Sequence, residues 1–201
     1  MSIRTVSLCI AGLYSSVWYV SAADAAMISI ANGQAVYDNT QNMTWLANAN
    51  LAAAQTFGVS GINRDGSMSW DTAQKWISAL NAAHYLGSGQ WTLPTTQLPD
   101  TGCSQLPKAA SFGYGCTGSQ MGTLYYDELG GVKGSTIGLT HNANYSMFNN
   151  FQPYLYWSST LWTRVPNSAF SFSFGNGFQG TNVFANDMYV IPVSPGRLPP
   201  Q

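Results

Sequence analysis

Charged side chains are scarce in this sequence. Of 201 residues, 7 are Lys or Arg and 8 are Asp or Glu, which gives a net charge of −1. Nucleic-acid-binding proteins neutralise phosphates with clustered Lys and Arg, and this chain has no such cluster, so the composition argues against a nucleic-acid partner. The same scarcity argues against long-range steering of a charged substrate. Aromatic residues, in contrast, make up 13% of the chain and include 7 Trp, which indicates a folded domain rather than a disordered polymer.

Histidine is almost absent, and no familiar catalytic motif is present. His84 and His141 are the two histidines, and neither has a second ligand at metal-binding spacing. The sequence has no G-x-S-x-G nucleophile motif. Asp127 and Glu128 are adjacent on an expected helix and so point in different directions, which makes a poor acid–base pair. We expect a protein that is not an enzyme and holds no cofactor.

One apolar run is long enough to require an explanation, and it lies at the N-terminus. Arg4 precedes an apolar stretch that reaches Val20, and Ala23-Asp24-Ala25 has the small-residue form of a signal-peptidase site. The alternative is an N-terminal membrane anchor, for which the stretch is short. The pattern predicts a signal peptide over residues 1–25 and a secreted, periplasmic or cell-surface protein without a stable membrane span after cleavage.

Cysteine is also rare, with three residues in the chain. Cys9 lies inside the apolar run, so removal of the signal peptide leaves Cys103 and Cys116. An even number of cysteines in an oxidising compartment favours one disulfide, with two free thiols as the alternative. A loop of this size would be stabilised by roughly 3 kcal/mol through the bridge.

Hydrophobic periodicity predicts an α+β domain with two main helices and a C-terminal antiparallel β-meander. One helix begins after Ser69 and runs from Trp70 to about Leu86, with His84 on its buried stripe, and a second covers 120–129. A short helix is expected over 49–57. The expected strands are 27–30, 35–38, 43–46, 155–160, 169–174 and 188–193. In the strand 169–174, three phenylalanines alternate with serines and point to one face, and the glycines after it predict a hairpin turn.

Several segments together resemble a known family. Residues 90–95 read Q-W-T-L-P-T, residues 156–160 read Y-W-S-S-T, and residues 168–177 form a strand followed by a glycine-containing turn. In this order they resemble the Lcl C-terminal-like family, a bacterial domain family of largely undefined function. The resemblance implies a C-type-lectin-like fold, shared with formylglycine-generating enzymes, over residues 26–196, with 197–201 as an irregular tail. Thr92 stands where the family usually has arginine.

Other features of the resemblance bear on chemistry. Formylglycine-generating activity needs a closely spaced reactive cysteine pair, and Cys103 and Cys116 lie in a loop outside any such motif. Some C-type lectins bind calcium through clustered oxygen ligands, which Asn182, Asn186 and Asp187 could supply. Asparagine-rich loops usually only turn the chain, so no metal site is predicted. Trp91 and Trp157 are expected to fill the core.

The stretch from His141 to Tyr156 is the best candidate for a binding site. It mixes aromatic rings, on which the C–H faces of sugars pack, with amides that hydrogen-bond to hydroxyl groups. The predicted ligand-binding residues are Asn144, Tyr145, Asn149, Gln152 and Tyr154. The sequence therefore suggests a secreted recognition or adhesion domain for a neutral glycan or cell-surface ligand. The alternative is a structural subunit of an extracellular assembly, and the sequence does not separate the two.

Overall fold

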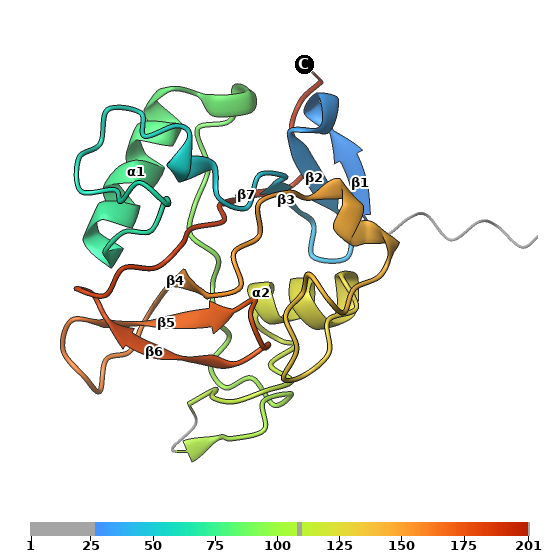
Figure 1. The fold of residues 1–201 in the computed structure, drawn as a ribbon, viewed down its shortest axis with the longest axis vertical. Coiled ribbons are helices and arrows are strands. Elements are labelled where there is room, and N and C mark those ends of the chain that lie inside the picture. Colours follow the sequence, from blue (N-terminus) through green and yellow to red (C-terminus); the bar gives the residue numbers. More distant parts are fainter. Residues whose placement is uncertain (1–26, 108–109, 201) are drawn as a thin grey trace, which may run out of the picture.

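Two antiparallel sheets and two helices make up the computed structural model, which describes residues 27–107 and 110–200 (Figure 1). The expected signal peptide lies outside the described residues. The first sheet has the strand order β1-β2-β3-β7. Its strands are β1 (Met27–Ile30), β2 (Ala35–Asp38), β3 (Met43–Leu46) and β7 (Val193–Pro195). The last of these brings the C-terminal end of the domain back to its N-terminal strands.

The second sheet is the predicted β-meander. It consists of β4 (Leu155–Leu161), β5 (Ser168–Ser173) and β6 (Gln179–Val183), paired antiparallel in that order. All six residues of β5 are buried, so the serines between the phenylalanines face a packed interior as the phenylalanines do. The buried hydroxyl of Ser171 accepts a hydrogen bond of 2.9 Å from Asn182 on β6, which satisfies it without water.

The helices form where they were predicted, with different ends. Helix α1 (Trp70–Ala82) begins at Ser69, whose side chain accepts a hydrogen bond from the backbone of Thr72. Helix α2 (Gln120–Thr123) continues as the π-helical turn η5 (Leu124–Glu128). The 3-10 turns include η1 (Ala31–Gly33), η2 (Leu51–Ala53), η3 (Tyr85–Gly87) and η6 (Ala143–Met147).

Two hydrophobic cores lie on opposite faces of the sheets. Val36, Trp45 and Val193 are paired across β2, β3 and β7 and pack into the first core, together with helix α2 and β5. The neighbouring residues Ala35 and Leu46, also paired, point into the second core with helix α1. Alternation along β2 and β3 therefore places side chains in both cores, as a sheet buried on two faces requires.

Trp91 and Trp157 fill the second core, as predicted. Their indole nitrogens donate hydrogen bonds of 2.9 Å to the backbone oxygens of Tyr85 and Met68, respectively. Each ring thus buries a large apolar area while its one polar atom is satisfied.

Three local predictions were wrong. Helix α1 ends at Ala82, and His84 is exposed in a left-handed conformation instead of lying on the buried stripe. The helix expected over 49–57 is the single turn η2: Asn50 before it is non-helical, and Phe57 has a positive φ that a helix does not admit. Over residues 188–193, where a strand was expected, the chain is mostly an extended segment that does not pair continuously with one neighbouring strand.

That extended segment changes partners along its length. Met188 pairs with Met68, Tyr189 donates its backbone N–H to Leu155, and Val193, the first residue of β7, pairs with Thr92. An apolar run alone does not distinguish such a segment from a strand, because burial is the same in both.

Candidate ligand-binding site

Three loops meet beyond the end of β5. They are residues 130–142, residues 148–154 and the hairpin turn 174–178. The backbone N–H of Gly134 donates to Asn176 at 2.8 Å, and that of Phe174 donates to Tyr154 at 3.0 Å. A Cβ at Gly175 would lie 2.5 Å from the backbone oxygen of Pro153, so only glycine lets the turn approach this closely.

An open cavity of about 320 Å³ lies between two of these loops. It is lined by Pro153, Tyr154, Leu155, Ser173, Gly175, Asn176 and Phe178. This volume is at the lower end of the range for small-molecule sites, so the cavity suits one small group rather than a long chain. The rigid end of the β4–β5–β6 sheet positions the two loops, an arrangement common in binding sites.

The cavity offers aromatic surface and uncharged polar atoms. Tyr154 is 53% exposed, and its hydroxyl makes no hydrogen bond within the described part of the chain. The side-chain oxygen of Asn176 accepts a 3.0 Å bond from the backbone of Phe178, and its amide nitrogen, which has no partner among the described residues, remains available as a donor. Ser173 accepts a 3.2 Å bond from Gly175 and retains its own proton for donation.

Of the five residues predicted to bind ligand, Tyr154 lines this cavity. The other four make hydrogen bonds or ring contacts that stabilise the surrounding loops. Asn144 donates from its amide to the backbone oxygen of Glu128 at 2.9 Å, and Gln152 donates to Asn150 at 2.9 Å. Asn149 exchanges backbone hydrogen bonds with Ala47 and Ala49.

Tyr145 belongs to a stack of rings beside these loops. Its ring lies 4.2 Å from that of His141 and 5.8 Å from that of Phe151, nearly parallel to both. Phe151 in turn packs on Phe174 at 4.7 Å. Tyr145 is partly buried against the first core, so its ring mainly anchors the loop.

Ser173, Asn176 and Phe178 line the cavity and were not predicted as site residues. The sequence signal at these positions, Gly175-Asn176-Gly177, was interpreted as a turn alone. The turn faces the 148–154 loop only because β4 and β5 pair with Leu155 opposite Ser173. That register was not assigned from the sequence.

Buried tyrosines beneath the loops remain protonated. Tyr156 accepts a 2.7 Å hydrogen bond from the backbone of Gln152, and burial raises its pKa well above the usual range. Burial and the neighbouring Tyr126 raise the pKa of Tyr125 to about 12. The Tyr125 hydroxyl donates to the backbone oxygens of Val132 and Ser135, which fixes the 130–142 loop. Both hydroxyls are therefore expected to be uncharged at physiological pH.

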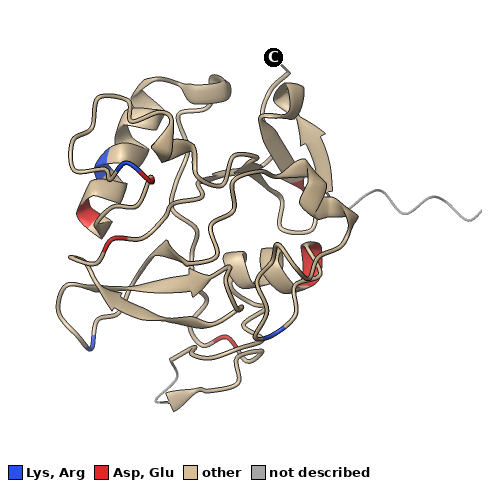
Figure 2. Cartoon of the chain, viewed as in Figure 1, with Lys and Arg blue, Asp and Glu red and all other residues tan. Residues whose placement is uncertain are grey.

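Charges are few and dispersed over the described residues (Figure 2). One group of possible metal ligands lies within 4.8 Å in that part of the chain: Asp100, Cys103 and Cys116. The two cysteines form the predicted disulfide. Asp100 already accepts hydrogen bonds from Gly102, Gly118 and Ser119, so its oxygens are committed to the protein.

The three residues considered for calcium make hydrogen bonds within the protein. Asn186 donates to the side-chain oxygen of Asn182 at 3.2 Å, so these amides bond to each other. Asp187 accepts a 2.9 Å bond from Asn63.

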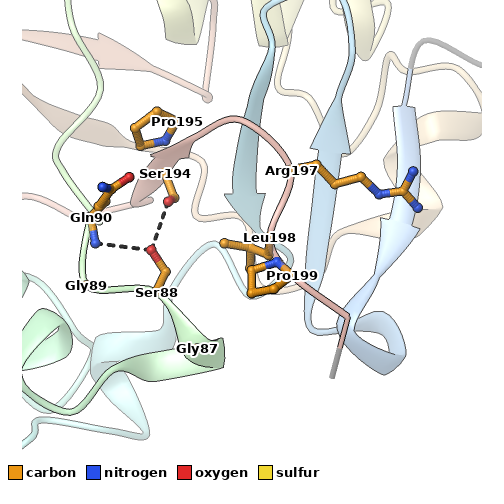
Figure 3. A pocket seen from close by; sticks show the side chains of 9 residues that line it. All are labelled: Gly87, Ser88, Gly89, Gln90, Ser194, Pro195, Arg197, Leu198 and Pro199. Atoms are coloured by element: carbon orange, nitrogen blue, oxygen red, sulfur yellow. Dashed lines mark hydrogen bonds between the residues drawn. The ribbon is translucent and has the colours of Figure 1, made fainter.

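A second cavity, of about 250 Å³, lies beside the C-terminal tail (Figure 3). Ser88 and Ser194 face each other there at 3.0 Å, and Ser88 also accepts a 3.1 Å bond from the backbone of Gln90. The tail has no regular structure, and Leu198 is packed into the second core. This cavity has no aromatic ring, and its hydroxyls are paired with each other, so it is the weaker candidate.

Within residues 27–107 and 110–200, no helix has the length and hydrophobicity needed to cross a membrane. No curated protein and no solved structure matches the chain. The family model of the Lcl C-terminal domain matches residues 34–194, which contain both helices, the cavity and both sheets except β1 and the last residue of β7. By this match, the chain belongs to the Lcl C-terminal domain family.

Proposed function

We propose that this protein is an exported, non-catalytic recognition domain that binds a neutral glycan at the cavity between the 148–154 loop and the 174–178 turn. The observation that carries the proposal is the half-exposed ring of Tyr154, at the edge of a cavity that also offers an unpaired amide donor. The finer classification of the fold as C-type-lectin-like is part of the proposal. It is supported by the sequence resemblance and by the α+β architecture.

The chemistry of the cavity favours a sugar over other small ligands. Sugar rings have apolar C–H faces that pack on aromatic rings, and hydroxyl groups that exchange hydrogen bonds with amides and hydroxyls. Tyr154 and Phe178 supply the rings, and Asn176 and Ser173 supply the polar atoms. No charged side chain lines the cavity. An anionic ligand would therefore be desolvated there without a charged partner, at a cost in affinity.

A role as a structural subunit is the second candidate, and exposed apolar residues favour it. Leu139 is 81% exposed, and Val132 is 53% exposed. The two lie close together, because the backbone of Val132 donates to the hydroxyl of Thr140 at 3.3 Å. Exposed apolar side chains that lie near one another can mark a contact between proteins. A concentration-dependent oligomer in sedimentation experiments, lost in Leu139→Ala, would support this candidate.

The test of glycan recognition compares two variants on an array of neutral and anionic oligosaccharides. Tyr154→Ala should weaken binding of a neutral glycan about tenfold, since one aromatic contact contributes roughly 0.5–1.5 kcal/mol. Leu139→Ala, an exposed apolar residue on the neighbouring loop, should leave the Kd unchanged.

Moderate salt should have little effect on binding, because a neutral ligand forms no screened ion pairs. Two results would overturn the proposal. One is the absence of binding to any neutral glycan, and the other is affinity that requires negative charge on the ligand and disappears as salt is added.

A further inference from the structure

Phe178, one wall of the cavity, is supported from behind by a residue far away in the sequence. The ring of Tyr114 packs edge-to-face on that of Phe178, with the centroids 5.3 Å apart and the planes at 80°. Tyr114 belongs to the loop that the Cys103–Cys116 disulfide closes. It does not line the cavity itself.

The disulfide loop holds Tyr114 in place through backbone contacts. Gly113 exchanges two hydrogen bonds with Gln179, at 2.9 and 2.7 Å, which attaches the loop to the edge of β6 directly after Phe178. Ser104 donates its backbone N–H to Tyr114 at 2.8 Å, and its hydroxyl accepts the Tyr114 N–H at 3.0 Å. Both cysteines are buried. The position of the Tyr114 ring is thus set by the loop and not by the side chain alone.

A third loop contacts the same ring. The ammonium group of Lys133 lies 4.9 Å from the centre of Tyr114, in a cation–π arrangement. The next residue, Gly134, donates to Asn176 of the cavity. Tyr114 therefore lies between the 130–142 loop and the 174–178 turn, and it joins the disulfide loop to the ligand site.

We propose that Tyr114 is a positioning residue for ligand binding: held by the disulfide loop, it fixes the orientation of the Phe178 ring that the ligand contacts. This inference rests on the proposed glycan site. Its physical basis is that a ring already held in its binding orientation loses little conformational freedom when the ligand binds. Without Tyr114, the Phe178 ring has an open space behind it and more orientations available.

The test uses three variants of the full exported protein and the neutral glycan that wild type binds most tightly. Tyr114→Ala should raise the Kd about fivefold, the size expected for the loss of one aromatic edge contact. Tyr114→Phe should bind as wild type, because the Tyr114 hydroxyl makes no hydrogen bond among the described residues. Tyr37→Ala is the matched control, since Tyr37 also lies under a cation, Arg197 at 5.7 Å, but on the first sheet.

A readout independent of ligand is the NMR signal of the Phe178 ring. In Tyr114→Ala that signal should shift and broaden, while in Tyr114→Phe it should remain near its wild-type position. Wild-type affinity or an unchanged Phe178 signal in Tyr114→Ala would overturn the positioning role, as would an equal loss of affinity in Tyr37→Ala. Failure of the wild-type protein to bind any neutral glycan would overturn the proposed function and this inference together, so the two failures are distinguishable.

Discussion

The carboxylate of Asp100 lies beside the disulfide and organises the loop around it. One oxygen accepts the backbone N–H of Gly102 at 3.0 Å. The other accepts the backbone N–H groups of Gly118 and Ser119 at 3.0 and 2.9 Å, and the Ser119 hydroxyl at 2.9 Å. Asp100 is 1% exposed, so these bonds are shielded from water. The sequence showed this residue only as one of several scattered aspartates, because its partners lie up to 19 residues away.

Asp100→Ala should lower the free energy of unfolding by about 3 kcal/mol, because each buried donor left without a partner costs roughly 1–3 kcal/mol. Urea denaturation followed by tryptophan fluorescence measures this loss. Asp127→Ala, which removes an exposed carboxylate, should change the stability by less than about 0.5 kcal/mol. Equal effects of the two substitutions would show that the hydrogen bonds to Asp100 contribute nothing.

The asparagines illustrate what composition can and cannot predict. Their abundance in residues 141–156 is typical of loops, and the prediction of Asn144 and Asn149 as ligand contacts rests on residue type. The side-chain amide of Asn144 donates a hydrogen bond to the backbone carbonyl of Glu128. Asn176, which lines the cavity, was interpreted only as part of a turn. Which asparagine lines the cavity depends on long-range strand register, and local sequence does not encode it.

At the scale of elements, periodicity predicted the existence of the two main helices and of the β4–β5 hairpin, because each follows a single repeat. It failed over 188–193, where each residue bonds to a different segment. Periodicity also did not predict that β5 is buried on both faces. In the sequence, a serine that is hydrogen-bonded inside the protein gives the same alternating pattern as a serine that faces water. Helix α2 was predicted as one continuous helix, and its second half is the π-helical turn η5, which ends in the buried carboxylate of Glu128.

Glu128 should make stability depend on pH. Burial raises its pKa above the ordinary value of 4.5, and the negative charge of the buried Asp38 raises it further. Asp127 acts in the same direction, while a hydrogen bond from Thr40 acts against it. The folded protein thus holds the Glu128 proton more tightly than the unfolded chain. This contribution to stability is fully present below pH 4.5 and is lost as the pH rises through the folded-state pKa.

Glu128→Gln removes the titrating group and keeps the shape of the side chain. The variant should be more stable than wild type at pH 7, and its stability should vary less between pH 4.5 and 7. Thermal unfolding of both proteins across this range provides the comparison. A wild-type stability that rises with pH in parallel with the variant would contradict the assignment.

At the scale of the whole molecule, the last strand of the described chain lies beside its N-terminal strands. Strand β7 pairs with β3, and the helices and the second sheet lie between them in sequence. The family match agrees with the resemblance found in the sequence, and it covers residues 34–194. Neither the match nor the motifs identify a ligand, because a fold can support many functions.

Export is a prediction about the whole chain. The N-terminal pattern predicts cleavage after Ala25, or within two residues of it, by signal peptidase. Mass spectrometry of the protein recovered outside the cytoplasm should therefore find a chain that begins near Ala26. Recovery of the intact chain from Met1, embedded in membrane, would favour the anchor instead.

The central claim is that a neutral glycan binds at the cavity beyond the end of β5. The most direct test is to titrate the isotope-labelled protein with a neutral oligosaccharide and follow the backbone amide signals by NMR. The predicted result is a saturable shift of the signals of Tyr154, Asn176 and Phe178, with those of Ser88 and Ser194 unchanged. Shifts confined to the tail cavity around Ser88 and Ser194, or no shift with any neutral oligosaccharide, would contradict it.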